Sequence, residues 1–485
     1  MVLRSSLSRI ALALAGLAVV AAGPGAGPAW AQGLSIQETI LRSKPAVVLI
    51  IAEVGAEVTL NCGDGPTTVS PKPAFRETGT GWIVESSGFV ITNAHVIQPA
   101  HEPPAWLVNQ QAQKAVTTAC LPKALKAANL EPGQSPDREE ALKRRLLDQV
   151  LGTAKVKLNP QIVVQLSSGA PVKAEVKKYS PPVKGAPGDI SGRDLALLKI
   201  PGEHFPVLPL ADSKFAQIGD RIYIFGFPGV VLSHELLNES SSREASVNPG
   251  SVSGFKEDVA NLPVIQTDAP SSWGNSGGPA VTDKGEVLGV LTFVSVTPGA
   301  EGSIVQGFNF IIPSAAVRDF LEGTQVKPTG KSSFNDAWFA GLREFFTEDW
   351  AGAVSQFQRA EKHQPRLPDV KHMLAQAQEK VKNPPPRPFP WFLVAIGVTV
   401  LSAGGYGAMF LRGWQRNRYR VQPSEVIRLQ ESGKSPVIVD VRKPEIYDAM
   451  PLKIPGSVRI APDEMASAVK ALDLDVTRPV VAYCT

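Results

Sequence analysis

One serine lies in a loop of small and turn-forming residues that suits a nucleophile. The loop covers residues 271–279, and Ser276 lies within its Gly-Asn-Ser-Gly-Gly-Pro segment. Because glycine has no Cβ, the chain can turn sharply there, expose a hydroxyl and direct backbone amides at one point. An ordinary turn is the alternative, so a catalytic reading needs a base, and an acid that orients the base, elsewhere in the chain.

His95 and Asp194 are the candidates for these two roles. The sequence predicts a hairpin of strands 79–84 and 89–96, which places His95 at the end of the second strand. Asp194 stands at the head of the apolar strand 195–200, where a carboxylate is costly unless it is paired. The structural alternatives are a half-buried histidine at a strand end and an aspartate that caps a turn. Together with Ser276, the three residues could act as base, orienting acid and nucleophile.

Short apolar segments separated by turns surround these residues. Further strands are predicted at 46–51, 162–166, 172–176, 221–225, 250–255, 264–268, 287–294 and 307–312, with short helices at 35–43 and 314–322. This pattern of many short strands separated by turns predicts an all-β pair of barrels over residues 32–325. Residues 55–77 are expected to be rich in loops, and 98–160 to be an insertion with surface helices, either a spacer or a substrate gate.

The motifs around His95, Asp194 and Ser276, in this order, resemble those of the trypsin-like serine proteases. Gly-Thr-Gly-Trp at 79–82 and Ile-Gln-Thr-Asp-Ala at 265–269 resemble the bacterial Deg/HtrA branch. The resemblance covers about residues 35–320 and implies two perpendicular β-barrels with the triad in the cleft between them. It also implies an oxyanion hole at Gly274, Asn275 and Ser276, and a pocket for a small or medium apolar side chain. Its pocket residues would be Thr292, Phe293, Asn309 and Phe310.

Composition and the N-terminus indicate an exported protein. The net charge is +4 over 485 residues, which gives no case for nucleic-acid binding. Residues 1–31 have the basic start, apolar run and small-residue end of a signal peptide, an uncleaved anchor being the alternative. Cys62 and Cys120 would then meet an oxidising compartment and could pair, which the sequence leaves open. We expect no metal and no cofactor, because the three cysteines show no metal-binding spacing.

The region after the barrels changes to helical spacing. Residues 333–382 resemble a tetratricopeptide repeat through Gly341, Phe345, Trp350, Ala353, Phe357, Ala360 and Pro365. The resemblance implies an α-helical hairpin, which could be a stalk or a module that binds a peptide or protein partner. A Pro-rich linker, 383–390, precedes 391–411, which carries no charge and is long enough for a single transmembrane helix. A buried core helix is the alternative.

Residues 421–485 resemble the start of a rhodanese domain, an α/β fold. The resemblance rests on the strand 437–442, the Ile-Pro-Gly-Ser segment 454–457 and Val-Val-Ala-Tyr-Cys at 480–484. It implies a sulfur-carrying role for Cys484, but the amide loop that should follow this cysteine is missing and Lys453 replaces a common histidine. We therefore expect a partial domain without sulfurtransferase activity.

These segments together predict a multidomain, membrane-anchored serine endopeptidase that cleaves exported proteins. The expected location is the bacterial inner membrane, crossed once, with the protease in the periplasm and the C-terminus in the cytoplasm. Protein or peptide substrates and the membrane are the expected partners, and oligomers are left open. Alternatives are a gated or inactive protease-like sensor that signals to the cytoplasmic domain, and a cytoplasmic sulfurtransferase on a membrane anchor.

Overall fold

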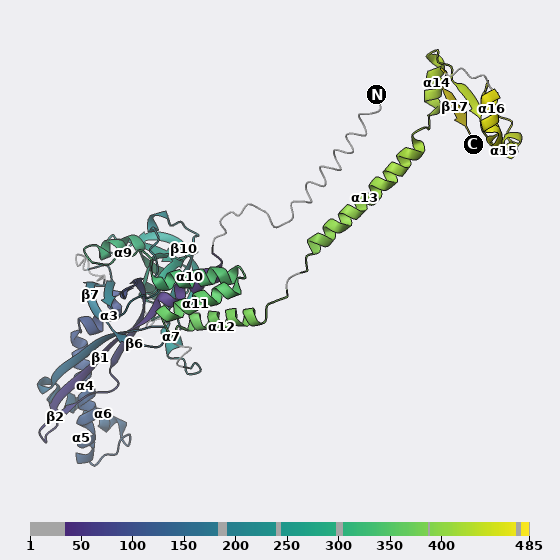
Figure 1. Cartoon of the computed structure of the whole chain (residues 1–485). Helices are drawn as coiled ribbons and strands as arrows, with labels where there is room; N and C mark the ends of the chain where they lie inside the picture. The colour runs from purple at the N-terminus through teal and green to yellow at the C-terminus, as the bar shows by residue number, and fades with distance from the viewer. Residues whose placement is uncertain are drawn as a thin grey trace. The chain divides into compact units, whose positions relative to one another are not determined.

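The computed structural model describes residues 34–182, 192–238, 244–296, 304–386, 389–471 and 477–484 (Figure 1). The predicted signal peptide, 1–31, lies outside these residues. The chain divides into two compact units, one of residues 27–386 and one that contains 387–485. We describe each unit by itself.

An antiparallel sheet forms the first β-body of the larger unit. Its strands are β1 (Val47–Asn61), β2 (Pro66–Val69), β3 (Phe75–Glu85), β4 (Phe89–Thr92), β5 (Lys155–Gln165), β6 (Pro171–Lys173), β7 (Glu175–Ser180) and β8 (Leu195–Lys199). They follow the order β6-β5-β1-β3-β4-β8-β7, and β2 pairs with β1. The edge strands β6 and β7 are separated in the chain only by Ala174, so one stretch of chain passes from one edge to the other. The sheet is therefore strongly curved, although no ladder between described residues closes it.

The second β-body is a closed barrel of six strands in the order β10-β11-β14-β13-β12-β9. The strands are β9 (Arg221–Gly226), β10 (Ser246–Glu257), β11 (Pro263–Thr267), β12 (Pro279–Thr282), β13 (Val287–Val296) and β14 (Ile304–Pro313). Short helical segments are α2 (Ile36–Ser43), η1 (Lys44–Ala46), η3 (Ser213–Phe215), α7 (Gly229–Leu232) and α9 (Ser314–Leu321). Trp82 and Leu197 of the first body and Phe225 of the second are buried in one shared core. The predicted β-barrel character is confirmed, with one closed barrel and one open, curved sheet.

The first sheet differs from the prediction between residues 52 and 77. Strand β1 runs on to Asn61 and pairs with β2, β3 and β5, so the region expected to be loops is mostly strand. The physical reason is the alternation of buried residues beyond Ile51, at Val54, Ala56, Val58 and Leu60. This period of two is typical of a strand with one face in a core.

The predicted insertion forms a lobe with helices and its own core. Its elements are α3 (Ala94–His101), α4 (Ala105–Ala119), α5 (Leu121–Ala127), α6 (Pro136–Val150) and η2 (Leu151–Thr153). Val58 of β1, Val116 of α4 and Val150 of α6 are buried together in this lobe. The insertion ends earlier than expected, because residues 155–160 belong to β5 and pair with the outer half of β1.

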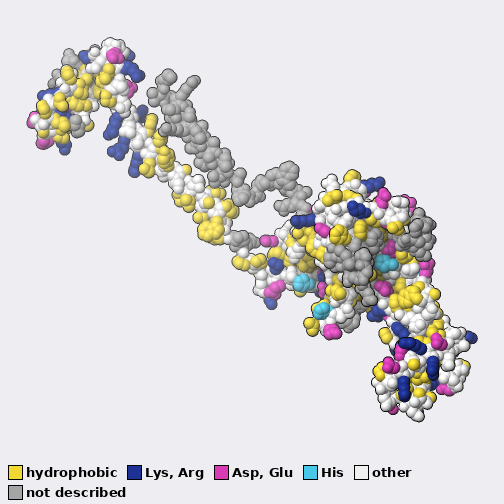
Figure 2. Space-filling model, turned by 180° about the vertical axis from the view of Figure 1, so that it is seen from behind, with side chains coloured by type: hydrophobic (Ala, Val, Ile, Leu, Met, Phe, Trp, Pro, Cys, Tyr) yellow, Lys and Arg dark blue, Asp and Glu magenta, His cyan; other side chains and the backbone are white. Residues whose placement is uncertain are grey.

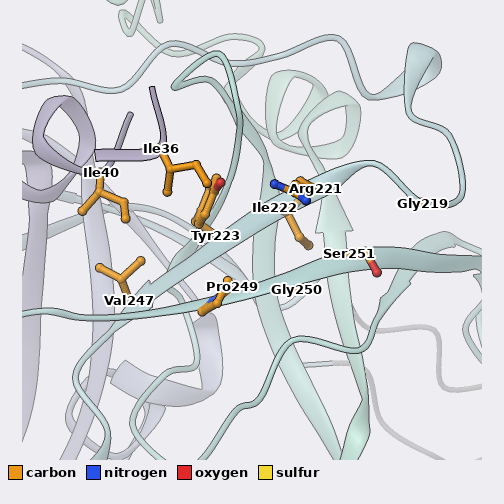
Figure 3. A pocket seen from close by; sticks show the side chains of 10 residues that line it. All are labelled: Ile36, Ile40, Gly219, Arg221, Ile222, Tyr223, Val247, Pro249, Gly250 and Ser251. Atoms are coloured by element: carbon orange, nitrogen blue, oxygen red, sulfur yellow. The ribbon is translucent and has the colours of Figure 1, made fainter. Parts of the chain in front are cut away.

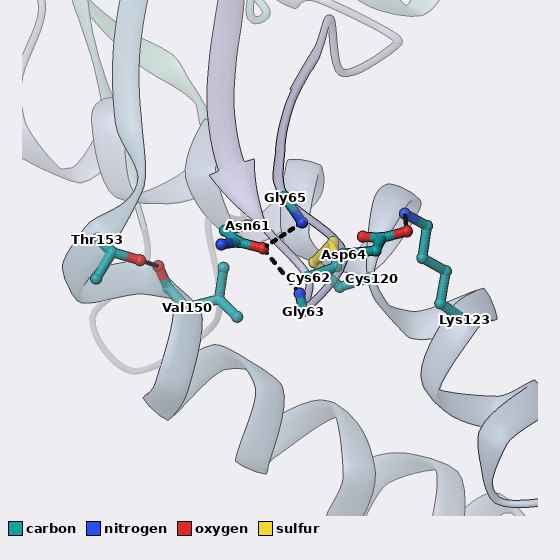
Figure 4. Close-up of a disulfide and its surroundings, with 9 residues drawn as sticks. All are labelled: Asn61, Cys62, Gly63, Asp64, Gly65, Cys120, Lys123, Val150 and Thr153. Carbon is teal, nitrogen blue, oxygen red and sulfur yellow. Dashed lines mark hydrogen bonds and ion pairs between the residues drawn. A yellow bond between two sulfur atoms is a disulfide. The ribbon is translucent and has the colours of Figure 1, made fainter.

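A disulfide fixes the outer end of this lobe (Figure 4). Cys62, just beyond β1, is bonded to Cys120, which lies between α4 and α5. Next to it, the side-chain oxygen of Asn61 accepts hydrogen bonds from the backbone N–H groups of Gly63 and Gly65 at 2.9 and 3.1 Å. Lys123 pairs with Asp64 at 2.7 Å. The strands and helices of the lobe are therefore joined covalently as well as through their core.

Three helices follow the barrels: α10 (Ser333–Phe346), α11 (Trp350–His363) and α12 (Pro368–Lys382). Gly341 is required where α10 meets α11, because a Cβ there would lie 2.6 Å from the Phe357 ring. The indole N–H of Trp338 donates to the carbonyl of Leu41 in α2 at 2.8 Å. These helices thus pack against the protease-like body, while their tetratricopeptide character stays a prediction.

The smaller unit contains one long apolar helix and a small α/β segment. Helix α13 (Trp391–Asn417) has 27 residues and contains an 18-residue window with a mean hydropathy of 1.7, enough in length and composition to cross a membrane. The rest comprises α14 (Pro423–Glu431), β15 (Val437–Asp440), α15 (Pro444–Ala449), β16 (Val458–Arg459), η4 (Pro462–Glu464), α16 (Met465–Ala471) and β17 (Val480–Tyr483). Its strands are parallel in the order β16-β15-β17, and Cys484 is exposed after β17. The rhodanese resemblance remains a prediction.

Candidate active site

His95 lies in the first turn of helix α3, not at the end of a strand as predicted. Strand β4 stops at Thr92, and Asn93 occupies the N-cap position of α3 without capping it through its side chain. The Asn93 side chain instead donates to the backbone carbonyl of Asp194 at 2.8 Å. Meanwhile Asp194 Oδ1 accepts the backbone N–H of His95 at 2.9 Å. A carboxylate from a distant part of the chain, just before β8, therefore satisfies the N-terminus of this helix, where negative charge is favoured.

The same carboxylate holds the imidazole of His95. The distance from His95 Nδ1 to Asp194 Oδ2 is 2.7 Å. With Nδ1 as the donor to the carboxylate, Nε2 is left as a proton acceptor. Asp194 thus fixes both the backbone and the ring of His95.

Asp194 is buried, and three donors compensate its charge. Besides the two groups of His95, the hydroxyl of Thr292 on β13 donates to Asp194 Oδ2 at 2.7 Å. The backbone of Asp194 has a φ of 52°, in the left-handed region that Asp and Asn tolerate better than most residues. This conformation places Asp194 directly before β8, with its own N–H donating to the carbonyl of Pro181 at 3.0 Å.

Ser276 lies on a tight turn next to this pair. Gly277 has a φ of 87°, and its N–H donates to the carbonyl of Leu291 at 2.8 Å. The Ser276 carbonyl accepts the N–H of Thr80 on β3 at 2.8 Å, which ties the turn to the first sheet. The Ser276 hydroxyl donates to the carbonyl of Thr292 at 3.1 Å. Between described residues there is no hydrogen bond from this hydroxyl to His95, so the side chain has to rotate to reach the imidazole.

Two backbone N–H groups of the turn are available to a ligand. The Trp273 carbonyl accepts the N–H of Gly229 at 2.7 Å. Since a trans peptide directs its C=O and N–H to opposite sides, the N–H of Gly274 points away from Gly229. The N–H groups of Gly274 and Ser276 donate to no other described residue. This arrangement could bind a developing oxyanion.

A cavity of about 320 Å³ brings the three candidate residues together, with Trp273, Arg193 and Asp258 also in its wall. Sequence reasoning missed these wall residues, although Trp273 lies in the serine loop and Arg193 precedes Asp194. A larger groove of about 550 Å³ lies between α2 and strands β9 and β10 (Figure 3). Its wall is mainly apolar and contains none of the candidate catalytic residues, so we assign the chemistry to the smaller cavity.

The four predicted pocket residues have different surroundings. Thr292 lines the cavity, but its hydroxyl is bonded to Asp194, so it orients the acid as well as forming a wall. Asn309 is buried, and its side-chain N–H donates to the carbonyl of Ala269 at 2.7 Å, which gives it a part in supporting the barrel. Phe310 lies on β14 opposite Gln266, and the side chain of Phe293 lies outside the described side chains.

The charges around His95 favour its protonated form. Burial lowers the pKa of His95, but the hydrogen bond and negative charge of Asp194, with a further contribution from Glu77 on β3, outweigh burial and raise it. Burial in turn raises the pKa of the Glu77 carboxyl, against the effect of His95. The imidazole is thus poised to hold a proton at a somewhat higher pH than a free histidine.

Comparisons with known proteins agree with this geometry. Residues 79–290 match the family model described as a trypsin-like peptidase domain. The chain is 30% identical over 295 residues to the mouse serine protease HTRA4, covering 60% of this chain and 43% of that protein. It is 30% identical over 261 residues to a probable periplasmic serine endoprotease, DegP-like, of Pseudomonas putida strain GB-1, covering 53% and 36%.

The matches are partial. The chain spans less than half the length of these curated relatives. A solved serine endoprotease from Yersinia pestis is 22% identical with a TM-score of 0.32, covering 59% of this chain and 65% of that chain. Residues 79–290 carry a trypsin-like peptidase domain similar to those of the HtrA and DegP-like serine proteases.

Proposed function

We propose that this protein is a serine endopeptidase that cleaves polypeptides through an acyl-enzyme formed on Ser276. The observation that carries the proposal is the two-point bond from Asp194 to the backbone and ring of His95, in the cavity that also contains Ser276. A structural histidine at the end of a strand, or an aspartate that only caps a turn, would not need hydrogen bonds between the carboxylate and both the backbone N–H and the ring of the histidine. Similarity to serine proteases over residues 79–290 supports the same reading.

The proposed mechanism follows from the donors and acceptors of the cavity. A serine hydroxyl is a weak nucleophile at neutral pH, so His95 Nε2 takes its proton as Ser276 attacks the peptide carbonyl. Asp194 keeps the imidazole in the required tautomer and stabilises its cation. The N–H groups of Gly274 and Ser276 bind the oxyanion, a contribution of roughly 3 kcal/mol per donor in comparable sites. His95 then protonates the leaving amine, and water releases the acyl group by the reverse sequence.

A fluorophosphonate probe tests the proposal directly. Such a probe reacts with serines that an adjacent base activates. We expect the intact protein to form one adduct, located by peptide mass spectrometry at Ser276 and not at Ser271 or Ser272 of the same loop. Heat-unfolded protein is the control and should not react. No adduct at Ser276 in folded protein, either alone or with an added substrate, would refute the proposal.

The raised pKa of His95 predicts the pH dependence of cleavage. His95 accepts a proton only when neutral, so kcat/KM falls as the pH drops through its pKa, and this acidic limb should lie above about 6.5, the usual histidine value. Glu77→Gln removes a negative charge that raises this pKa, so the limb should move to lower pH. Glu57→Gln, on the outer half of β1, is the control and should leave it unchanged. A Glu77→Gln profile identical to that of the wild type would contradict the prediction.

We further propose an extracytoplasmic location with α13 as a single membrane anchor. The length and hydropathy of α13, the signal-like N-terminus and the periplasmic designation of a relative support this proposal. Exported polypeptides are then the expected substrates. Protease added to spheroplasts should digest residues 34–386 and spare 421–485; digestion of both or of neither would contradict this topology.

One observation favours a second candidate, a gated peptidase. The Ser276 hydroxyl donates to the Thr292 carbonyl instead of contacting His95, as expected of a resting site. If the gate is closed, probe labelling at Ser276 should occur only after a substrate or partner is added, which separates this reading from a constitutively active enzyme.

A further inference from the structure

A basic groove lies on the insertion lobe, formed by other elements than those that carry the triad. It has a volume of about 310 Å³, and three lysines line it: Lys72, Lys114 and Lys143. The amide side chains of Gln110 and Gln113 also line it. None of the described residues that line the groove is acidic. We refer to this site as the basic groove.

Helical spacing explains how these residues come together. Gln110, Gln113 and Lys114 lie three and four residues apart, so they share one face of α4. Lys143 and Leu147 lie four residues apart on α6, which packs against α4. Lys72 enters from the connection between β2 and β3. The groove therefore runs between two helices that the lobe core and the disulfide hold in place.

Two of the three lysines in the groove have no acidic partner among the described residues. Neither Lys72 nor Lys114 forms an ion pair with a described residue, and Lys143 has only Glu140, at 3.4 Å. The side-chain oxygen of Gln110 is buried and has no partner among the described residues. Figure 2 shows Lys and Arg side chains on the lobe at the end of the larger unit, interspersed with Asp and Glu side chains. Like charges gathered in a concave site attract anions, because the low-dielectric walls focus their field.

We propose that the basic groove binds an acidic segment of a polypeptide and so acts as an exosite of the proposed peptidase, on which this inference rests. The lysines would pair with Asp or Glu carboxylates, and the glutamine amides with peptide groups of the same segment. From Gln110 to Thr118 the groove follows α4 for about 12 Å, the length of about four extended residues. Helix α3, which carries His95, is joined to α4 by a connection of three residues, so the triad base and the groove lie on consecutive helices.

A polypeptide fits this site better than an anionic membrane surface. Surface segments that bind membranes combine basic residues with exposed large apolar side chains that enter the lipid. Within α4, α5 and α6, Trp106 at the start of α4 is the only large apolar side chain that is strongly exposed. The lysines line an open groove that also presents glutamine and threonine side chains, which suits an extended chain.

The binding test uses the full-length protein with Ser276→Ala, in detergent. The probe is a fluorescent peptide with four consecutive Glu residues, compared with the same peptide carrying Gln instead. We expect the Glu peptide to bind by fluorescence anisotropy with a salt-dependent affinity, and the triple variant Lys72→Gln, Lys114→Gln, Lys143→Gln to bind about tenfold more weakly. The matched control, Lys126→Gln, Lys155→Gln, Lys173→Gln, removes the same charge from exposed sites outside the groove and should change the affinity less than twofold.

Several results would overturn the inference. These are equal binding of the Glu and Gln peptides, an equal effect of the two triple variants, or binding of phosphatidylglycerol vesicles in place of the peptide. An unchanged thermal unfolding midpoint of the triple groove variant excludes misfolding as the cause of weaker binding. As a second readout, Lys114→Arg keeps the positive charge and should bind the Glu peptide more tightly than Lys114→Gln. Peptide binding does not depend on catalysis, so the two proposals fail separately. Peptide binding without a Ser276 adduct in the wild-type protein would contradict the proposed peptidase and support the proposed exosite. A Ser276 adduct without peptide binding would support the peptidase and contradict the exosite.

Discussion

Replacing Asp194 by asparagine should lower kcat/KM about 10⁴-fold while the protein stays folded. Asparagine tolerates the φ of 52°, so the backbone can keep its conformation. Its amide NH₂, however, would meet donors, because both carboxylate oxygens of Asp194 accept hydrogen bonds from His95 and one also from Thr292. His95 Nδ1 would then accept a hydrogen bond from this NH₂ and the ring proton would lie on Nε2, which is the tautomer that cannot deprotonate Ser276.

A chromogenic peptide assay measures this effect, and Asp258→Asn is the matched control. Asp258 lines the same cavity, but its Oδ1 accepts only backbone N–H groups, from Ala260 and Leu262 at 2.8 and 3.0 Å. The asparagine variant retains an oxygen for these bonds, so its kcat/KM should fall less than about threefold. If Asp194→Asn retains more than a tenth of the wild-type activity, Asp194 does not orient the base.

Gly277→Ala should destabilise the protein by about 2–5 kcal/mol and displace the serine turn. Roughly 1–2 kcal/mol of this comes from placing a Cβ at positive φ, and about 1–3 kcal/mol from overpacking. The added Cβ would lie 2.1 Å from the backbone carbonyl oxygen of Thr80 and 2.4 Å from the hydroxyl of Thr92, and neither neighbour is the end of a flexible side chain. Urea unfolding and the peptide assay report the two effects.

Gly285→Ala separates the two causes. Gly285 has a φ of 79°, but no atom lies within 4 Å of the Cβ position. Its alanine variant should therefore lose only the backbone contribution of about 1–2 kcal/mol and keep full activity. Equal losses for the two variants would show that contact with Thr80 and Thr92 contributes nothing.

Local patterns were enough to predict the motifs but not every element that positions them. The sequence around Ser276 predicts a turn, and the structure has glycines with positive φ on both sides of Asn275 and Ser276. The placement of His95 in α3 was not predicted, because the apolar run up to Val96 reads as a strand. What stops the strand is Asp194, which satisfies the helix N-terminus from far along the chain. No short-range pattern contains that contact.

The role of Thr292 was out of reach for a similar reason. The sequence alone does not show whether a threonine on a barrel strand faces a pocket or the core. Only the packing of the two β-bodies brings the hydroxyl of Thr292 to Asp194. The extension of β1 is different, because its alternation beyond Ile51 is present in the sequence. Gly55 within the strand, and the glycines and prolines that follow it between residues 63 and 73, obscured the signal.

The contacts of helix α10 decide which piece of the chain can be produced by itself. Asn335 in this helix donates to the carbonyl of Val207 at 2.8 Å and accepts the N–H of the same residue at 3.2 Å. Val207 belongs to the connection between the two β-bodies. A protein truncated near residue 325, the predicted end of the protease domain, would leave these buried groups and the Leu41 carbonyl without partners. A recombinant fragment for crystallisation or screening should therefore extend through α12, to about Pro386, so that the two β-bodies are purified with the helices that pack against them.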